Sequence, residues 1–500
     1  MNPKELEEKY QENKDKFHKY IDNIKLKMKV DIYSIINTTL IINPYSTKFP
    51  LNFFLKKYTN TNKLFLFVKS ICKFYIKQFY LLLSYVVSFF LYKIYYNHKV
   101  LNENSYIGID LFLLVDNIIK DDMFNENYFK TIYPILDKKY KNYIFIPRLY
   151  RIGKNPFKLV KLFKILNQDN RKFLFEFELL SFRDFISIFM MILIYPFKTL
   201  RLLQEENTLE DKLFNIELIN DISSMGFDAF VRYVYGSNIS KINNINIIYS
   251  WSEFQVVERS FNYGVRNNNN IIKLIACQFY LNYEIYFNSV VHDVDFYNLS
   301  APHKILVNGS KYMKDREKVK YEVGVSLRYK NTFDFMGIES ENNILLLGSY
   351  IEKDTKYMLE SVASLRNVIF KNHPAVSIDK FTNISSNIVI SNANIYELFK
   401  HTSVAIGTAS GSSVEAVACG ISVIIIASKD NLTVNPLVAY GKGKVWDIAF
   451  NKDDVERVYN NLIKYRNNNT EETKKIASWY KDNFFIEPTE KNIINNLGIL

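Results

Sequence analysis

Short apolar runs alternate with amphipathic stretches from residue 245 onward. Residues 245–250, 271–276 and 304–309 are apolar runs bounded by polar or turn residues. Between the first two, residues 253–263 repeat apolar side chains at helical spacing and end near Gly264. Strands that alternate with helices in this way are typical of a parallel sheet. The pattern predicts one α/β unit ending near residue 310.

A second unit with the same alternation opens at residue 343. Its predicted strands are 343–349, 367–370, 388–391, 404–407 and 422–427, and its predicted helices are 357–365, 395–401 and 412–419. Gly420 follows the last of these helices, where glycine commonly ends a helix. Elements this short and regular predict a doubly wound sheet.

The first 240 residues give a weaker pattern. Residues 1–29 are polar and predict an exposed helix or a loose arm, whereas residues 30–100 are apolar, aromatic and predominantly helical. Residues 143–147 predict a buried strand stopped by Pro147, and residues 156–166 and 209–230 predict two helices. Residues 310–340 predict the connection between the two units.

These elements predict an α/β fold with two Rossmann-like domains whose parallel sheets face a cleft, the GT-B arrangement. A chain of 500 residues also exceeds one ordinary hydrophobic core. The predicted organisation is a helical, aromatic-rich region, a first Rossmann-like domain on the acceptor side with helical insertions, a second Rossmann-like domain that binds the donor, and a helical tail: residues 1–100, 101–330, 331–470 and 471–500.

Charge and cysteine content narrow the functional classes. Most of the net charge of +12 lies in residues 1–100, where lysines outnumber acidic residues. Such an excess attracts nucleic acid or an anionic membrane, although it is equally compatible with a solvated surface. We expect no nucleic-acid partner, because no zinc, RRM or KH pattern accompanies the lysines. Three scattered cysteines and a polar N-terminus predict a cytoplasmic protein.

Two uncharged stretches, residues 78–92 and 185–197, complicate that prediction. Both are shorter than the roughly 20 apolar residues that a spanning helix requires. We expect buried helices there. The alternative is a lysine-flanked aromatic helix that lies in the membrane interface, which would place the enzyme on the inner face of the cell membrane.

Two polar segments follow strands of the second predicted sheet. Lys371-Asn372-His373-Pro374 comes after the strand that ends at Phe370, and Gly407-Thr408-Ala409-Ser410-Gly411-Ser412-Ser413 joins a strand to a helix. Ligands of open parallel sheets bind at the carboxyl ends of the strands. The small residues, the hydroxyls and the free amides of the following helix suit a phosphate group. His373 adds a donor, and Pro374 would hold its loop rigid.

Two other kinds of nucleotide site are disfavoured, because the sequence lacks their motifs. No lysine follows in the Walker order and GxGxxG is absent, which argues against ATP hydrolysis and a standard dinucleotide site. No Asp-x-Asp pair stands at a convincing strand end. We therefore expect neither a metal nor a cofactor, with the nucleotide entering only as part of the substrate.

The segment from Lys371 to Val423 resembles the donor-binding half of bacterial GT-B glycosyltransferases of surface polysaccharide synthesis. The His-Pro followed by a serine-rich loop is similar to the CMP-sugar users, the sialyltransferase-like and Kdo-transferase-like enzymes. The resemblance implies that His373, Ser412 and Ser413 contact CMP. It also implies that Glu415 lies near the donor ribose, although an acidic residue in a helix's first turn also has a purely structural role.

Residues 249–259, with Gly264-Val265-Arg266 and Cys277-Gln278, resemble the central region of surface carbohydrate biosynthesis proteins. Gln278 is followed by Phe279 where related enzymes often have Gln-His, so a histidine of that family is missing here. Glu253 follows a strand and is our candidate base for an acceptor hydroxyl, unless it caps its helix. Asp228 is a second candidate base or nucleophile. Arg259 and Arg266 could pair with a phosphate or a sugar carboxylate.

The predicted function is transfer of a sugar, of the CMP-activated Kdo or sialic type, onto a surface glycan or lipid-linked acceptor, as in capsule or lipopolysaccharide synthesis. Two alternatives stay open at this point. One is a transferase or epimerase that uses a UDP-linked donor on the same fold, and the other is a non-catalytic scaffold of polysaccharide assembly.

Overall fold

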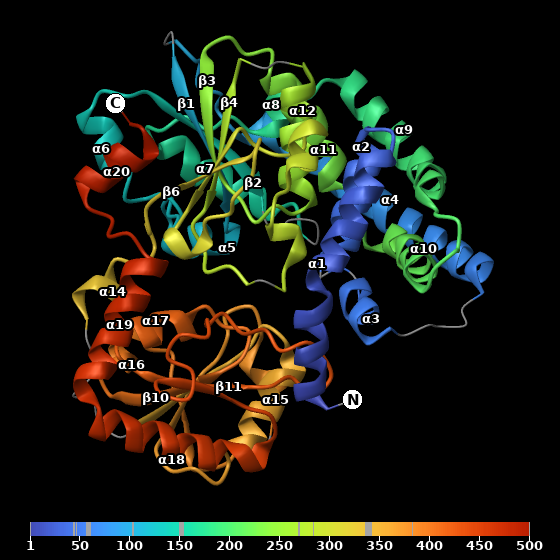
Figure 1. The fold of residues 1–500 in the computed structure, drawn as a ribbon. Helices are drawn as coiled ribbons and strands as arrows, with labels where there is room; N and C mark the ends of the chain where they lie inside the picture. The colour runs from blue at the N-terminus through green and yellow to red at the C-terminus, as the bar shows by residue number, and fades with distance from the viewer. Residues whose placement is uncertain are drawn as a thin grey trace.

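Two parallel six-stranded sheets organise the chain in the computed structural model (Figure 1). The structure describes residues 2–43, 46, 48–56, 62–102, 105–149, 155–268, 271–283, 285–335, 343–382 and 384–499. Each sheet is packed between helices, and a bundle of N-terminal helices covers one side of the first domain. The predicted fold class, α/β with two Rossmann-like domains and a helical, aromatic-rich N-terminal region, is confirmed.

The first sheet has the strand order β2-β1-β3-β4-β5-β6. Its strands are β1 (Tyr106–Leu113), β2 (Tyr143–Leu149), β3 (Ile245–Trp251), β4 (Lys273–Gln278), β5 (Lys304–Val307) and β6 (Lys320–Val323). Short helices connect them: α5 (Val115–Asp121), α6 (Tyr133–Lys138), α7 (Lys158–Gln168), α8 (Glu176–Leu179) and α13 (Asp293–Tyr297). Pro147 does not end its strand as predicted, since β2 continues to Leu149. Proline is tolerated at this position because β2 is an edge strand of the sheet.

The second sheet has the order β12-β11-β10-β7-β8-β9. Its strands are β7 (Asn343–Leu347), β8 (Val368–Lys371), β9 (Ile388–Ile390), β10 (Thr402–Gly407), β11 (Ser422–Ile426) and β12 (Trp446–Ala449). One face packs on α16 (Ile395–Phe399), α17 (Ser412–Ala418) and α19 (Thr470–Phe484), and the other on α15 (Glu352–Ser361) and α18 (Lys452–Asn468). Buried aliphatic side chains from both faces form its core.

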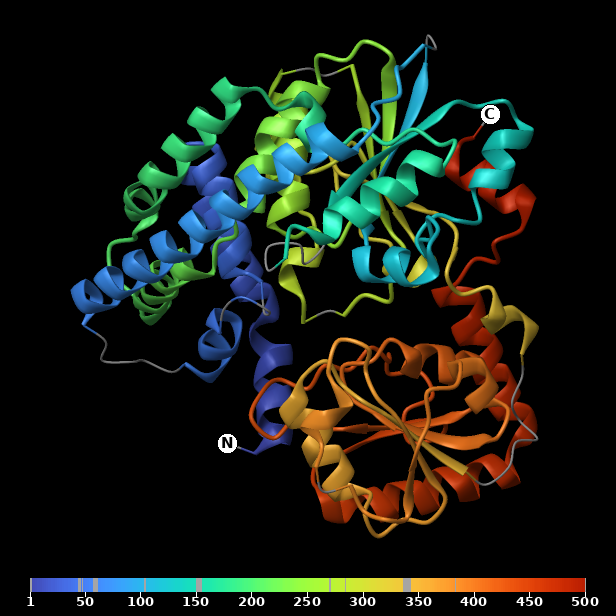
Figure 2. The same ribbon diagram turned by 180° about the vertical axis from the view of Figure 1, so that it is seen from behind.

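The chain crosses between the domains twice. The segment after β6, with α14 (Asn331–Asp334), leads into the second sheet. After α19 the chain returns, and α20 (Glu490–Leu497) packs against the first domain, where Tyr249 donates to the Leu497 carbonyl and Asn496 donates to the Gly324 carbonyl (Figure 2). The division predicted at residue 330 lies between the two sheets.

The N-terminal bundle consists of α1 (Pro3–Lys27), α2 (Ile32–Ile41), α3 (Phe49–Leu55) and α4 (Lys63–Tyr95), packed with α9 (Phe182–Thr199) and α10 (Leu209–Asp221). A capping box of Asn2 and Glu5 starts α1. Near its end, Lys25 forms a buried ion pair with Asp295 of α13 at 2.8 Å. The bundle is therefore joined to the first domain by charge as well as by apolar packing.

The helix predicted over residues 209–230 is wrong as one element. It is two helices, α10 and α11 (Asp228–Ile239), separated by a 3-10 turn and Gly226. α11 packs closely on α12 (Val256–Asn268): a Cβ at Gly264 would lie 2.2 Å from the Tyr233 carbonyl oxygen, and one at Gly236 would lie 2.6 Å from that of Phe261. Only glycine permits this approach.

Candidate functional site

The carboxyl ends of the two sheets meet through the segment that follows β4. In this segment the Tyr286 hydroxyl is hydrogen-bonded to the Tyr350 hydroxyl, which follows β7. A Cβ at Gly411, after β10, would lie 3.1 Å from the Cβ of Leu281. Figure 1 shows the two domains one above the other, with this segment between them. The strand ends of both domains therefore face a common region, which is where parallel sheets bind ligands.

His373 lies beside Tyr350 at the end of β8, with ring centroids 6.1 Å apart. The Ala375 N–H donates to His373 Nδ1 at 3.1 Å, and burial lowers the pKa of the imidazole. The ring is therefore neutral at pH 7 with its proton on Nε2, where it is a hydrogen-bond donor. Lys371 instead donates to the Ala393 carbonyl at 2.6 Å, and Pro374 is exposed.

Three backbone amides of the serine-rich turn after β10 already donate within the protein. Ala409 has a left-handed φ of 51° and donates to the Val434 carbonyl, while Ser413 and Val414 donate to carbonyls within the turn. Two of the amides expected to be free at this helix start are thus used, and α17 has only seven residues. Gly407 is buried at the end of β10, beside Leu347.

Hydroxyl groups of this turn are the available donors. The Thr408 and Ser413 side chains are 1% and 0% exposed, and within the described residues neither hydroxyl has a hydrogen-bond partner. A buried hydroxyl without a partner costs about 1–3 kcal/mol, and a bound ligand would remove that cost. Ser410 and Ser412 are half-buried on the same turn.

Glu415 lies one turn into α17 and is buried. Tyr396 donates a hydrogen bond to its carboxylate and is itself bonded to Thr332 at 2.8 Å. Burial raises the pKa of Glu415, while Tyr396, Arg328 and Ser412 oppose that rise. The predicted ribose contact for Glu415 stays a prediction, since the carboxylate here also positions Tyr396.

Glu253 follows β3 in a group of aromatic rings. Trp251 packs on Tyr128 at a centroid distance of 4.6 Å and on Tyr280 at 6.3 Å. Burial and the charge of Glu258 raise the pKa of Glu253, whereas Trp251, Arg148 and Arg328 lower it. The carboxylate makes no hydrogen bond to the described amides of α12, so it does not act as the helix cap that was the alternative. A half-buried carboxylate with a raised pKa is suited to accept a proton.

Arg328 connects the two halves of this region and was not identified from the sequence. Its exposed guanidinium lies over the rings of Trp251 and Tyr128, at 5.4 and 5.8 Å from their centroids. It lowers the pKa of Glu253 in the first domain and of Glu415 in the second. An exposed cation between two carboxylates on aromatic faces is well placed to bind a phosphate or carboxylate.

A buried ionic network supports the end of β3. Arg148 donates to the Trp251 carbonyl, pairs with Glu258 and lies 3.2 Å from Asp110. Asp110 also pairs with Arg232 at 2.9 Å and accepts from Ser250. Residues of β1, β2, β3, α11 and α12 all contribute to this network. The network therefore holds the backbone at the end of β3, which carries Glu253, in place.

Three residues predicted for the site, Arg259, Arg266 and Asp228, lie outside it. Arg259 is 1% exposed, pairs with Asp295 at 2.9 Å and donates to two backbone carbonyls. Arg266 donates to the Phe296 and Ala301 carbonyls, and burial lowers its pKa to about 10. These guanidinium groups are occupied within the first domain. Neither is placed to bind an acceptor or a sugar carboxylate.

Asp228 is the first residue of α11 and is partly exposed to solvent. The surrounding protein nevertheless desolvates its carboxyl, and this raises the pKa of that group. The charges that oppose this rise are those of Lys77 and Arg232, both in the first domain or its helical bundle. Asp228 is therefore apart from the group formed by Glu253, Arg328 and Glu415.

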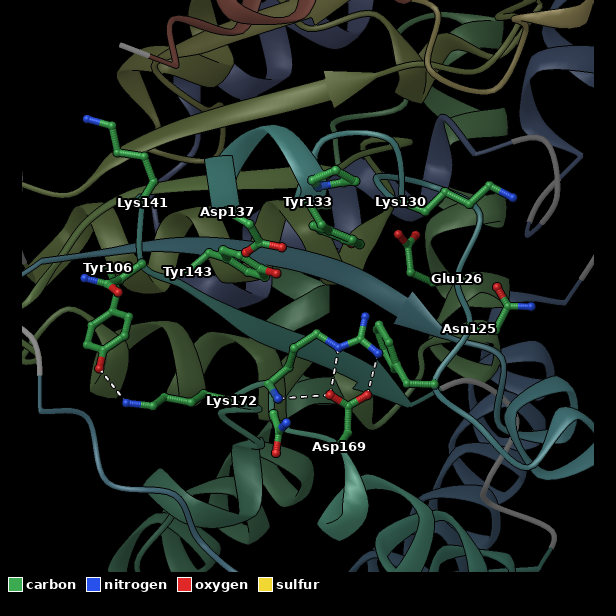
Figure 3. Close-up of a pocket in the computed structure, with 15 residues that line it drawn as sticks. Tyr106, Asn125, Glu126, Lys130, Tyr133, Asp137, Lys141, Tyr143, Asp169 and Lys172 are labelled. Atoms are coloured by element: carbon green, nitrogen blue, oxygen red, sulfur yellow. Dashed lines mark hydrogen bonds and ion pairs between the residues drawn. The ribbon is translucent and has the colours of Figure 1, made fainter. Parts of the chain in front are cut away.

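Two cavities lie near but outside these loops. One, of about 790 Å³, lies between α1, residues 282–316 of the first domain and residues 433–439 of the second. The other, of about 820 Å³, is at the outer edge of the first sheet (Figure 3). There Arg171 is paired with Asp169 and Lys172 donates to Tyr106. Tyr106 and Tyr143 begin β1 and β2, which places that cavity at the amino ends of these strands.

No family model and no curated protein matches this chain. Similar solved structures include a UDP-N-acetylglucosamine 2-epimerase (TM-score 0.41, 10% identity, covering 79% of this chain and 95% of that one). The Methanocaldococcus jannaschii UDP-GlcNAc 2-epimerase in complex with UDP-GlcNAc and UDP is similar at TM-score 0.40 and 12% identity, covering 79% and 100%. The wall teichoic acid polymerase TagF is similar at TM-score 0.36 and 10% identity, covering 78% and 86%.

Proposed function

We propose that this chain is a glycosyltransferase that takes its sugar from a nucleotide-activated donor. The observation that carries the proposal is the pairing, across the two sheets' carboxyl ends, of a half-buried base with donor groups. Glu253 and Arg328 come from the first domain. His373, Thr408 and Ser413 come from the second. Acid–base chemistry and anion binding in one place are what sugar transfer from a nucleotide requires.

In this proposal Glu253 takes the proton from an acceptor hydroxyl as the hydroxyl attacks the donor sugar. The bond from the sugar to the nucleotide breaks, and negative charge develops on the leaving phosphate. His373 Nε2–H, the hydroxyls of Thr408 and Ser413, and the Arg328 guanidinium are the groups suited to stabilise that charge. Lys371, Pro374, Gly407, Ser410, Gly411, Ser412 and Glu415 shape the same loops. No step requires a metal or a cofactor.

We further propose that the nucleotide is CMP and the sugar is acidic, of the Kdo or sialic type, on the strength of the sequence resemblance around His373. The acceptor in this proposal is a glycan or a lipid-linked glycan of the cell surface. The enzyme would work on the cytoplasmic face of the cell membrane, touching it through its basic N-terminal region.

Donor binding can be measured by thermal unfolding of the purified protein with CMP, CDP or UDP. A nucleotide at 100 times its Kd should add roughly 2.7 kcal/mol of stability. We expect CMP to protect most, and expect His373→Ala and Ser413→Ala each to weaken that protection. His401→Ala is the matched control, because His401 lies at the amino end of β10, whereas His373 and Ser413 follow the carboxyl ends of their strands. Protection by UDP alone would contradict the CMP assignment, and equal protection of all variants would contradict the site.

Arg328 offers a test of catalysis that is separate from donor affinity. We expect Arg328→Ala to lower kcat for sugar transfer by about 10²–10³, the loss that follows removal of one oxyanion-hole donor. Arg328→Lys should recover part of this, since it keeps the charge but not the planar fork. The exposed Arg457→Ala of α18 is the control. Unchanged kinetics in Arg328→Ala would remove this residue from the mechanism.

A further inference from the structure

The outward face of α4 is apolar along its whole length. The exposed positions recur every three or four residues, so they form one stripe. Its members are Phe65, Val68, Cys72, Ile76, Phe79, Leu83, Val87, Phe90 and Ile94. Ile76, Leu83 and Ile94 are 74%, 68% and 69% exposed. In a helix on a water-facing surface this stripe would be polar. The burial expected from the sequence is wrong for α4, whose most apolar 18-residue window is only 17% buried.

α9 extends the same apolar surface. Phe189 of α9 contacts Phe79 of α4, with ring centroids 6.2 Å apart, and Phe185 contacts Phe89 at 5.1 Å. Five exposed side chains of α9 are again large and apolar: Phe182, Ile186, Phe189, Met190 and Phe197. Figure 2 shows both helices along the outer side of the bundle, away from the second domain. Contiguous exposed apolar surface of this extent marks an interaction site.

Positive charge flanks the stripe. α4 contains five lysines and no acidic residue. Lys69, Lys73 and Lys93 are exposed, and on a helical projection they lie on either side of the apolar positions. Arg183 adds an exposed cation at the start of α9. Apolar residues bordered by lysine are the pattern of helices that bind anionic bilayers.

Polar contacts on the inner face hold α4 against the protein. Lys77 and Gln78 donate to carbonyls of Ser224 and Met225. Tyr75 donates to the Leu193 carbonyl at 2.7 Å, and Tyr92 donates to Glu178 at 2.9 Å. By length and composition α4 and α9 could each span a membrane. These contacts favour an orientation along the bilayer plane, because crossing would leave the polar groups without partners in lipid.

We propose that the outward face of α4 and α9 is the membrane-docking surface of this protein and inserts into an anionic lipid bilayer. The 33 residues of α4 give a straight contact about 50 Å long, at 1.5 Å per residue. The lysines are placed where lipid phosphates would lie, and that charge complementarity favours a bilayer over an apolar protein partner. The inference deepens the membrane contact of the proposed function and does not depend on which donor is used.

Cys72 lies in the stripe and is exposed, whereas Cys277 and Cys419 are buried, so a thiol-reactive fluorophore will label Cys72 selectively. On phosphatidylglycerol-containing vesicles we expect a blue shift and quenching by acyl-chain quenchers. A probe at Ile271→Cys in a Cys72→Ser background, also exposed but placed just before β4 and outside the stripe, should not change. A Cys72 probe that stays accessible to aqueous iodide on these vesicles overturns the proposal.

Vesicle flotation of the full chain tests the two components separately. Lys69→Glu/Lys73→Glu should weaken partitioning roughly thirty-fold or more, given about 1 kcal/mol for each surface lysine. Ile76→Ser/Leu83→Ser/Phe90→Ser should reduce it at every salt concentration, and Ile271→Ser/Val389→Ser is the exposed apolar control. Flotation equal to wild type in the stripe variant, or a lipid-free dimer that buries the Cys72 probe, contradicts the proposal. CMP protection should persist in all variants, which separates this outcome from failure of the proposed function.

Discussion

Glu253→Gln is expected to lower kcat/KM for sugar transfer by about 10²–10⁴, the range over which general bases contribute. The amide keeps the shape of the side chain but cannot accept the acceptor's proton. The buried ionic network of Arg148, Glu258 and Asp110 holds the backbone at the end of β3. The change at Glu253 should therefore leave the fold intact. Donor protection in thermal unfolding should also be preserved, since the donor groups lie in the second domain.

The pH dependence gives the same prediction a second readout. Burial and the charge of Glu258 raise the pKa of Glu253 above its usual value. A base must be ionised to act, so activity in the wild type should fall with decreasing pH at a higher pH than an ordinary carboxylate would give. This acid limb should be absent from the residual activity of Glu253→Gln. Glu317→Gln, an exposed carboxylate, is the control. An unchanged rate, or an acid limb that persists in the variant, would exclude Glu253 as the base.

Five strands of the second sheet, β7 to β11, could be predicted because they are short apolar runs. β10 and β11 are buried at every position, and loops of small or polar residues bound them. The strands that the sequence did not predict break this rule for physical reasons. β1 contains the buried Asp110, whose charge is paired with Arg148 and Arg232. β6 and β12 lie at sheet ends, and β6 carries Lys320 and Glu322.

The face of α4 could not be predicted for a different reason. Apolar residues occur all round this helix, so its sequence does not determine which side packs on the protein. Its inner face mixes polar and aromatic residues, Ser70, Phe74, Gln78, Ser88 and Tyr92. The bond from Gln78 to the Met225 carbonyl, which helps to fix this face, exists only in the folded bundle.

The position of the two polar loops, residues 371–374 and 407–413, followed from the sequence because each comes at the end of a strand of one sheet. Arg328 did not, because its importance depends on Trp251 and Tyr128, which are distant in the chain. The arginines of α12 illustrate the converse. A guanidinium on a helix near a strand end looks available until its partners are known. The partners of Arg259 are Asp295 of α13 and the backbone carbonyls of Phe254 and Asn288.

Arg259→Met is expected to destabilise the protein by about 3–5 kcal/mol, the cost of removing one member of a buried ion pair. Asp295 lies between Arg259 and Lys25, at 2.9 and 2.8 Å, and all three side chains are nearly inaccessible. Burial alone would raise the pKa of Asp295, but the charges of Arg259 and then Lys25 hold it well below its usual range. The variant leaves that carboxylate with one cation, and it also removes the donors to the Phe254 and Asn288 carbonyls.

The pH dependence of this loss has a definite sign. A carboxyl whose pKa is depressed on folding contributes stability that is complete above its unfolded pKa, about 4, and declines as pH falls through the folded value. The difference between wild type and Arg259→Met in urea unfolding should therefore be largest at neutral pH and shrink in acid. Lys25→Met/Arg259→Met/Asp295→Leu should recover much of the loss, because none of the three charges of this buried group then remains without a partner. If Arg259→Met unfolded at the wild-type urea concentration but raised the KM of the acceptor, Arg259 would belong to the acceptor site after all.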